Sequence, residues 1–74
     1  MLYDYTKLQD RIREKFGSPE KFAEHLGRAS VYVYSKIEYP RVEFRQSEIL
    51  SWCRELGIRV SEIQEYFFTL KENV

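Results

Sequence analysis

Residues 18–38 have the sequence SPEKFAEHLGRASVYVYSKIE, and this stretch carries the clearest structural pattern in the chain. Its first half predicts a short helix. Ser18 is a good N-cap, because its hydroxyl can accept from a free backbone N–H, and Pro19 suits the first helical position. Gly27 is expected to end this helix, since glycine readily takes the left-handed conformation of a helix exit. A second helix after the bridge at residues 27–29 would complete a helix-turn-helix.

Apolar side chains in this stretch follow helical spacing. Phe22, Ala23 and Leu26 fall on one face of the first segment. Ala23 is small, so two helices can approach closely there. Val33 and Ile37 lie one turn apart and are expected to anchor the second segment on the core.

The second segment has two possible structures. Residues 31–34 are β-branched and aromatic, so propensity alone favours a strand. The glycine turn and the apolar spacing favour a helix, because tertiary context can override propensity. We predict a helix, capped by Ser30 in place of Ala29. A short hairpin that pairs residues 31–37 with 41–45 is the alternative.

Three further helices are expected around this pair. The first is Tyr5–Phe16, with Asp4 as its cap. The second begins at Gln46 or Ser47 and ends at Leu56. The last is capped by Ser61 and has an acidic first turn at 62–65. The tail from Thr69 is expected to fray. Residues 1–74 therefore predict one compact all-α domain of five helices.

Composition narrows the class of protein. The 74 residues suit one domain, with 12 basic and 12 acidic side chains and a formal net charge of zero. No apolar run approaches the roughly 20 residues of a membrane span, and no signal peptide is apparent. Cys53 is the single cysteine, so no intrachain disulfide can form. These features predict a cytoplasmic protein.

Catalytic and metal-binding patterns are absent from the sequence. His25 and Cys53 cannot together supply the three or four protein ligands of a zinc site. They have no third orienting group for nucleophilic catalysis. We therefore expect no enzyme, no metal, no cofactor and no small-molecule substrate.

The helix-turn-helix pattern resembles that of phage Cro and lambda-type repressor proteins. The opening MLYDYTKLQDRIREKFGS, the Lys36-Ile37 pair, the run from Val42 to Ile49 and EIQEYFF at 62–68 resemble small Cro-like proteins of temperate phages of Gram-positive bacteria. The resemblance implies a lambda-repressor-like fold. It also implies a transcriptional regulator that binds double-stranded operator DNA in the bacterial cytoplasm, as a homodimer.

In such motifs the second helix lies in the major groove, with base edges facing its N-terminal residues. The base-facing candidates here are Ser30, Val31, Tyr34 and Ser35. The candidates for phosphate contacts, which position a protein without recognising sequence, are Lys21, Arg28, Lys36, Arg41 and Arg45.

The second helix departs from the family pattern. It offers no Arg, Asn or Gln to base edges and no Lys before Lys36. Pro19 stands where related proteins often have a phosphate-contacting glutamine. A Tyr/Val-rich face is typical of protein recognition. The alternative function is thus a modulator or antirepressor that docks on a phage repressor. A third hypothesis is a Cro-like protein with weak or lost DNA binding.

The C-terminal end is rich in apolar side chains for one short helix. The dimer candidates are Tyr66, Phe67, Phe68 and Leu70. A two-fold dimer would set two recognition helices about 34 Å apart. The alternative is that these residues complete the core of the monomer.

Overall fold

The computed structural model of the chain describes residues 3–38 and 43–71. These residues form α1 (Thr6–Phe16), α2 (Pro19–Leu26), α3 (Ser30–Ile37), α4 (Gln46–Leu56), a short 3-10 helix (Val60–Glu62) and α5 (Ile63–Phe67). Within the described ranges there is no strand, only one isolated bridge between Tyr3 and Leu70. The predicted all-α chain of five helices is confirmed. None of the described helices has the length and apolar character needed to cross a membrane.

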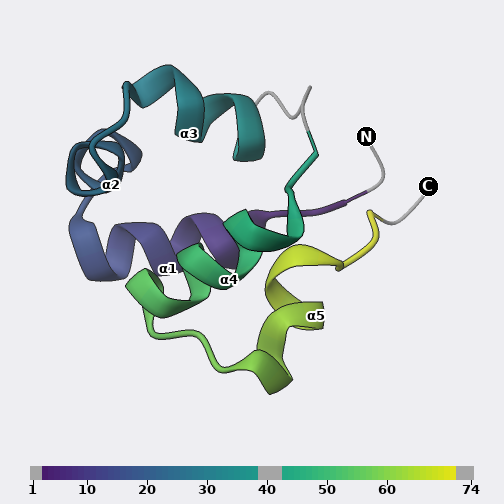
Figure 1. Cartoon of the computed structure of the whole chain (residues 1–74). Coiled ribbons are helices and arrows are strands. Elements are labelled where there is room, and N and C mark those ends of the chain that lie inside the picture. The colour runs from purple at the N-terminus through teal and green to yellow at the C-terminus, as the bar shows by residue number, and fades with distance from the viewer. Residues whose placement is uncertain (1–2, 39–42, 72–74) are drawn as a thin grey trace.

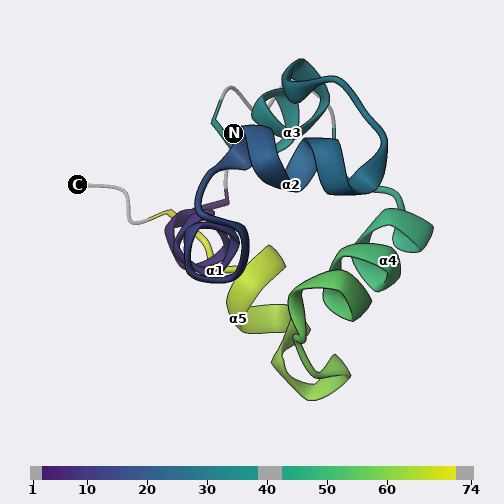
Figure 2. The same ribbon diagram turned by 90° about the vertical axis from the view of Figure 1, so that its left-hand side faces the viewer.

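The helices enclose one aromatic core. Figure 1 shows α2 and α3 at one end of the molecule and α5 at the other, with α1 and α4 between them. In the turned view of Figure 2, α1, α2, α4 and α5 surround a common centre. In the core the Phe44 ring meets those of Trp52 and Phe67 edge to face, at centroid distances of 4.8 and 5.1 Å. Phe22 meets Trp52 in the same way at 5.0 Å. This geometry suits the charge distribution of aromatic rings.

The boundaries of α2 follow from its end residues. The Ser18 hydroxyl accepts a hydrogen bond from the Lys21 N–H at 3.2 Å, and Pro19 takes the first helical position. At the other end Gly27 has a φ of 71°, in the left-handed region, and its N–H bonds the Glu24 carbonyl at 3.0 Å. The prediction of a helix over Pro19–Leu26 is confirmed.

Residues 30–37 are helical, so the hairpin alternative is wrong. Val33 and Ile37 lie one turn apart and are both buried in the core, which overrides the strand propensity of their neighbours. One detail of the prediction is corrected. Ala29 is the N-cap residue and Ser30 is the first helical residue, so Ser30 does not cap the helix.

Three expectations at the ends of helices are also corrected. α1 begins one residue later than predicted, at Thr6, whose N–H bonds the Asp4 carboxylate at 2.8 Å. Ser61 lies inside the 3-10 helix, so it does not cap α5. The Thr69 carbonyl accepts from the Asp4 N–H at 2.7 Å, so this part of the tail is held against the start of the chain.

Candidate interaction surface

The outer face of α3 presents an exposed apolar residue, an exposed serine and a second serine whose hydroxyl already donates a hydrogen bond within the chain. Val31 is 69% exposed and Ser30 is also exposed. Ser35 is half-buried, and its hydroxyl donates to the Tyr32 carbonyl at 2.8 Å. Val31 is therefore the most prominent side chain that this face offers to a partner.

Tyr34 is half-buried and tied to a carboxylate. Its hydroxyl donates to the Glu20 carboxylate of α2 at 2.5 Å. This hydrogen bond raises the pKa of the Tyr34 hydroxyl and lowers the pKa of the Glu20 carboxyl. A negative charge consequently stands beside the face that was predicted to meet DNA.

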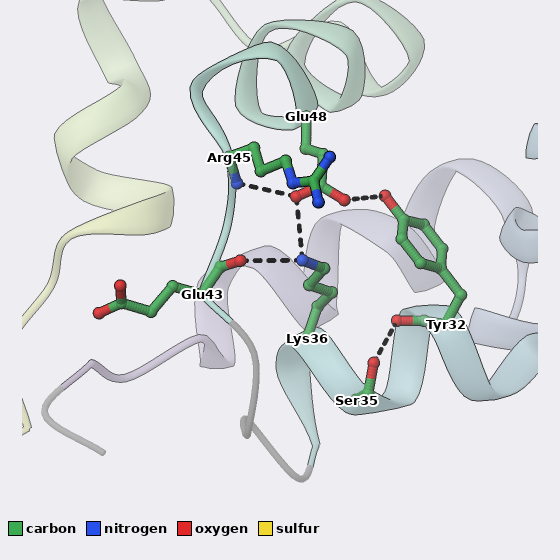
Figure 3. Close-up of polar contacts among 6 residues, drawn as sticks. All are labelled: Tyr32, Ser35, Lys36, Glu43, Arg45 and Glu48. Carbon is green, nitrogen blue, oxygen red and sulfur yellow. Dashed lines mark hydrogen bonds and ion pairs between the residues drawn. The ribbon is translucent and has the colours of Figure 1, made fainter.

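Lys36 was predicted at the surface as a phosphate contact, and its position is corrected by the structure. The residue is 4% exposed, and its ammonium donates to the Glu48 carboxylate and to the Glu43 carbonyl, both at 2.9 Å. Figure 3 shows the Lys36 side chain pointing from α3 toward the start of α4. An ammonium with these partners inside the molecule does not face a phosphate.

Glu48 is the centre of this polar cluster (Figure 3). Its carboxylate also accepts from the Tyr32 hydroxyl at 2.7 Å and from the Arg45 backbone N–H at 2.8 Å. Burial alone would raise the pKa of Glu48. The hydrogen bonds from Arg45, Tyr32 and Lys36 outweigh burial and lower the pKa to about 2. The carboxylate is therefore ionised at neutral pH and matched by the Lys36 ammonium.

The remaining phosphate candidates have different surroundings. Lys21, Arg28 and Arg45 are exposed, and the Arg28 guanidinium lies over the Tyr32 ring at 3.9 Å from its centre. Arg41 lies outside the described residues. The exposed acidic side chains on α2 and just after α3 are Glu20, Glu24 and Glu38. Among the described residues around α2 and α3, these three exposed acidic side chains balance the three exposed phosphate candidates. The structure therefore shows no predominantly basic face there.

The four dimer candidates divide into two pairs. Tyr66 and Phe67 are buried in the core of the chain itself. Phe68 is 43% exposed and Leu70 is 64% exposed. Only the second pair is thus available to another molecule.

The single histidine is hydrogen-bonded to a carboxylate, and the single cysteine lies in the core. The His25 Nε2 lies 2.7 Å from the Glu55 carboxylate, and its ring lies 4.8 Å from the Phe16 ring, between centroids. The hydrogen bond from His25 lowers the pKa of the Glu55 carboxyl. Cys53 is buried, and this burial raises the pKa of its thiol. In the part of the chain that the structure describes, no group of three His, Cys, Asp or Glu could hold a metal ion.

Comparison with protein families places the chain in a group without an assigned activity. Residues 1–70 match the family described as "Protein of unknown function (DUF739)". The chain is a member of the DUF739 family.

A solved structure is similar to this DUF739 chain over most of its length. It is the solution structure of the modulator of repression (MOR) of the temperate bacteriophage TP901-1 from Lactococcus lactis, with a TM-score of 0.80 and 34% sequence identity. The match covers 92% of this chain and 90% of that chain. Among curated proteins there is no match. The similarity is to a phage regulatory protein, and a Cro-like type is not shown.

Sequence reasoning about this DUF739 chain missed two partners of the α3 side chains. Glu48 stands three residues after Arg45, the spacing at which a glutamate folds back on the residue that begins a helix, and this signal was readable. Glu20 bonds Tyr34 across 14 residues, and no local pattern points to that pair.

Proposed function

We propose that this chain is a phage regulator that modulates repression in the bacterial cytoplasm by docking on a repressor protein. Its α2–α3 pair serves as a helix-turn-helix frame of the lambda-repressor-like type. The frame presents a protein-binding face in place of a DNA-binding one. The similarity to a modulator of repression supports this function.

The observation that carries the proposal is the state of α3. Its single lysine, Lys36, is buried against Glu48, and the hydroxyls of Tyr34 and Ser35 already donate to other groups of the chain. A helix that recognises bases normally offers free paired donors and acceptors to their edges. The exposed Val31 suits an apolar contact with another protein, where a few well-packed residues supply most of the binding energy.

The exposed cations Lys21, Arg28 and Arg45 favour operator DNA as the second candidate, since Lys and Arg supply phosphate contacts. The two candidates differ in what a change at α3 does. Loss of a phosphate contact weakens all DNA binding, whereas an altered apolar contact weakens binding to one protein.

The test is isothermal titration of the full chain with the repressor encoded by the same phage genome. Val31→Glu should lower the affinity about 30-fold or more, the effect expected for a central interface residue. A glutamate in the first turn of a helix is favourable for the fold, so α3 should persist. Val60→Glu is the matched control, because Val60 is 72% exposed in the 3-10 helix next to α5.

Val60→Glu should bind the repressor as the wild type does. If the wild-type protein does not bind the repressor but shifts operator DNA in a gel, operator binding would instead be established. Equal repressor binding by wild type and Val31→Glu would remove α3 from the interface.

A further inference from the structure

A groove runs between α3 and the first turns of α4, and we call it the α3–α4 groove. It consists of two adjoining hollows of about 320 and 440 Å³, which share Arg28, Tyr32, Ser47 and Glu48 as lining residues. Leu26 and Trp52 line the first hollow, and Arg45 lines the second. Charged side chains thus line both hollows, and apolar side chains join them in the first.

The acidic residue of the groove is already neutralised. The Glu48 carboxylate accepts from the Lys36 ammonium, the Tyr32 hydroxyl and the Arg45 backbone N–H. The ammonium and the carboxylate balance each other. As a result, this carboxylate does not offset the positive charge of the two arginines.

The two arginines provide that charge. The Arg28 guanidinium lies over the Tyr32 ring at 3.9 Å from its centre, and this cation–π contact holds the group beside the groove. The Arg45 side chain is exposed, while its backbone is fixed by the bond to Glu48. Within residues 3–38 and 43–71 neither guanidinium forms an ion pair. The groove thus carries two positive charges in a chain whose formal net charge is zero.

We infer that the α3–α4 groove binds an aspartate or glutamate side chain of the partner protein, with an apolar side chain of the partner beside it. This inference rests on the proposed function and names the chemistry that the partner must present. A planar guanidinium matches a carboxylate through two parallel N–H···O bonds. Ser47 can add a hydroxyl, and the half-buried Leu26 can contact the apolar neighbour.

The charge pattern favours a protein carboxylate over a DNA backbone. Duplex DNA carries a negative charge every 1.7 Å or so along its axis, and its binding sites engage many cations at once. Here the groove provides two cations, and the Glu20 carboxylate stands on the adjoining α2–α3 surface. A single carboxylate beside an apolar group is the better match.

The direct test uses a peptide probe, acetyl-Asp-Leu-Asp-amide, titrated at constant ionic strength into the full chain labelled with ¹⁵N. The side-chain Nε–H signals of Arg28 and Arg45 should shift and saturate. The signal of the exposed Arg59, outside the groove, should stay in place. Acetyl-Asn-Leu-Asn-amide should shift none of them. The double variant Arg28→Gln/Arg45→Gln, checked for an unchanged thermal melt, should lose the response to the acidic peptide in the backbone signal of Ser47.

Three results would overturn the inference. They are absence of any shift, an equal shift at Arg59, and saturation of the two arginine signals by random-sequence duplex DNA at lower concentration than by the peptide. The last result would make the groove a phosphate site.

The repressor titration separates this inference from the proposed function. Arg28→Gln/Arg45→Gln should lower repressor affinity at least tenfold, and Arg54→Gln/Arg59→Gln, with the same loss of charge, should change it less than twofold. If Val31→Glu abolishes binding and the groove variant does not, the groove inference fails and the proposed function stands. If the wild type does not bind the repressor, the proposed function fails and the peptide titration alone decides the groove.

Discussion

At the scale of single residues, the Glu48 carboxylate of α4 links that helix to α3 through hydrogen bonds. Glu48 receives three hydrogen bonds, including one from the buried Lys36 ammonium. Sequence alone predicted Lys36 at the surface, because lysine is rarely buried without a partner. The partner lies 12 residues away on another helix, so no local pattern could reveal it.

Replacement of Glu48 should expose the cost of an unpaired buried charge. Glu48→Gln leaves the Lys36 ammonium without its counter-ion, and breaking a buried pair in this way typically costs about 3–5 kcal/mol of unfolding free energy. Urea unfolding monitored by Trp52 fluorescence measures the loss. Glu14→Gln is the control, since its pair with Arg11 lies at the surface and should contribute less than about 1 kcal/mol. Equal losses in both variants would contradict the assigned role of Glu48.

The same carboxylate makes stability depend on pH in the acid range. Glu48 has a pKa of about 2 in the folded chain and an ordinary value of 4.5. Between these values unfolding takes up a proton, so this contribution is complete above about pH 4.5 and falls as pH approaches 2. One pKa unit is about 1.4 kcal/mol, so a shift from 4.5 to about 2 sets an upper limit of about 3.5 kcal/mol. Urea unfolding from pH 2 to 7 should show a shallower acid slope for Glu48→Gln than for the wild type. Parallel slopes would contradict the lowered pKa.

At the scale of elements, local sequence signals determine the ends of α2, whereas long-range contacts determine that α3 is a helix. Ser18, Pro19 and Gly27 are enough to place both ends of α2, and the structure agrees with them. Residues 31–34 favour a strand on their own, and burial of Val33 and Ile37 overrides that preference. The start of α5 was misplaced, because a 3-10 turn at Val60–Glu62 precedes it and such turns have no strong sequence signal.

At the turn between α2 and α3, the backbone conformation of Gly27, and not the room for a side chain, should limit which residues are tolerated. Gly27 has a φ of 71°, and an added Cβ would meet no atom within 4 Å. Gly27→Ala should therefore cost about 1–2 kcal/mol, the penalty of a left-handed conformation. Gly27→Asn should cost less, because asparagine tolerates that conformation better. Thermal melts of the two variants measure the difference, and a larger loss for asparagine would contradict this account.

At the scale of the whole molecule, the two ends have different tasks. The α2–α3 end carries the proposed docking face, and the α5 end closes the core with Tyr66 and Phe67. The apolar content of the C-terminal segment was recognisable in the sequence. Its division into core and surface was not, because that depends on where α5 packs.

A homodimer through the α5 end, which stays a prediction, would rest on the exposed Phe68 and Leu70. Phe68→Asp should then move the sedimenting mass from dimer to monomer with the fold retained. Leu50→Asp is the control, since Leu50 is exposed on α4 and should leave the mass as in the wild type. A folded Phe68→Asp variant with the wild-type mass would remove this interface.

The distribution of charge over the chain predicts its affinity for DNA and the salt dependence of that binding. Residues 1–37 contain seven basic and five acidic side chains, and one of the basic ones, Lys36, is buried. The exposed phosphate candidates within the described residues are Lys21, Arg28 and Arg45. Three phosphate contacts give a log–log salt slope of about −2.7 per chain. Fluorescence anisotropy with a random duplex should thus show weak binding that salt abolishes.

A random-site selection at low salt should enrich no motif, with the phage repressor as the positive control. An enriched motif that Lys21→Ala weakens would favour operator binding over repressor docking.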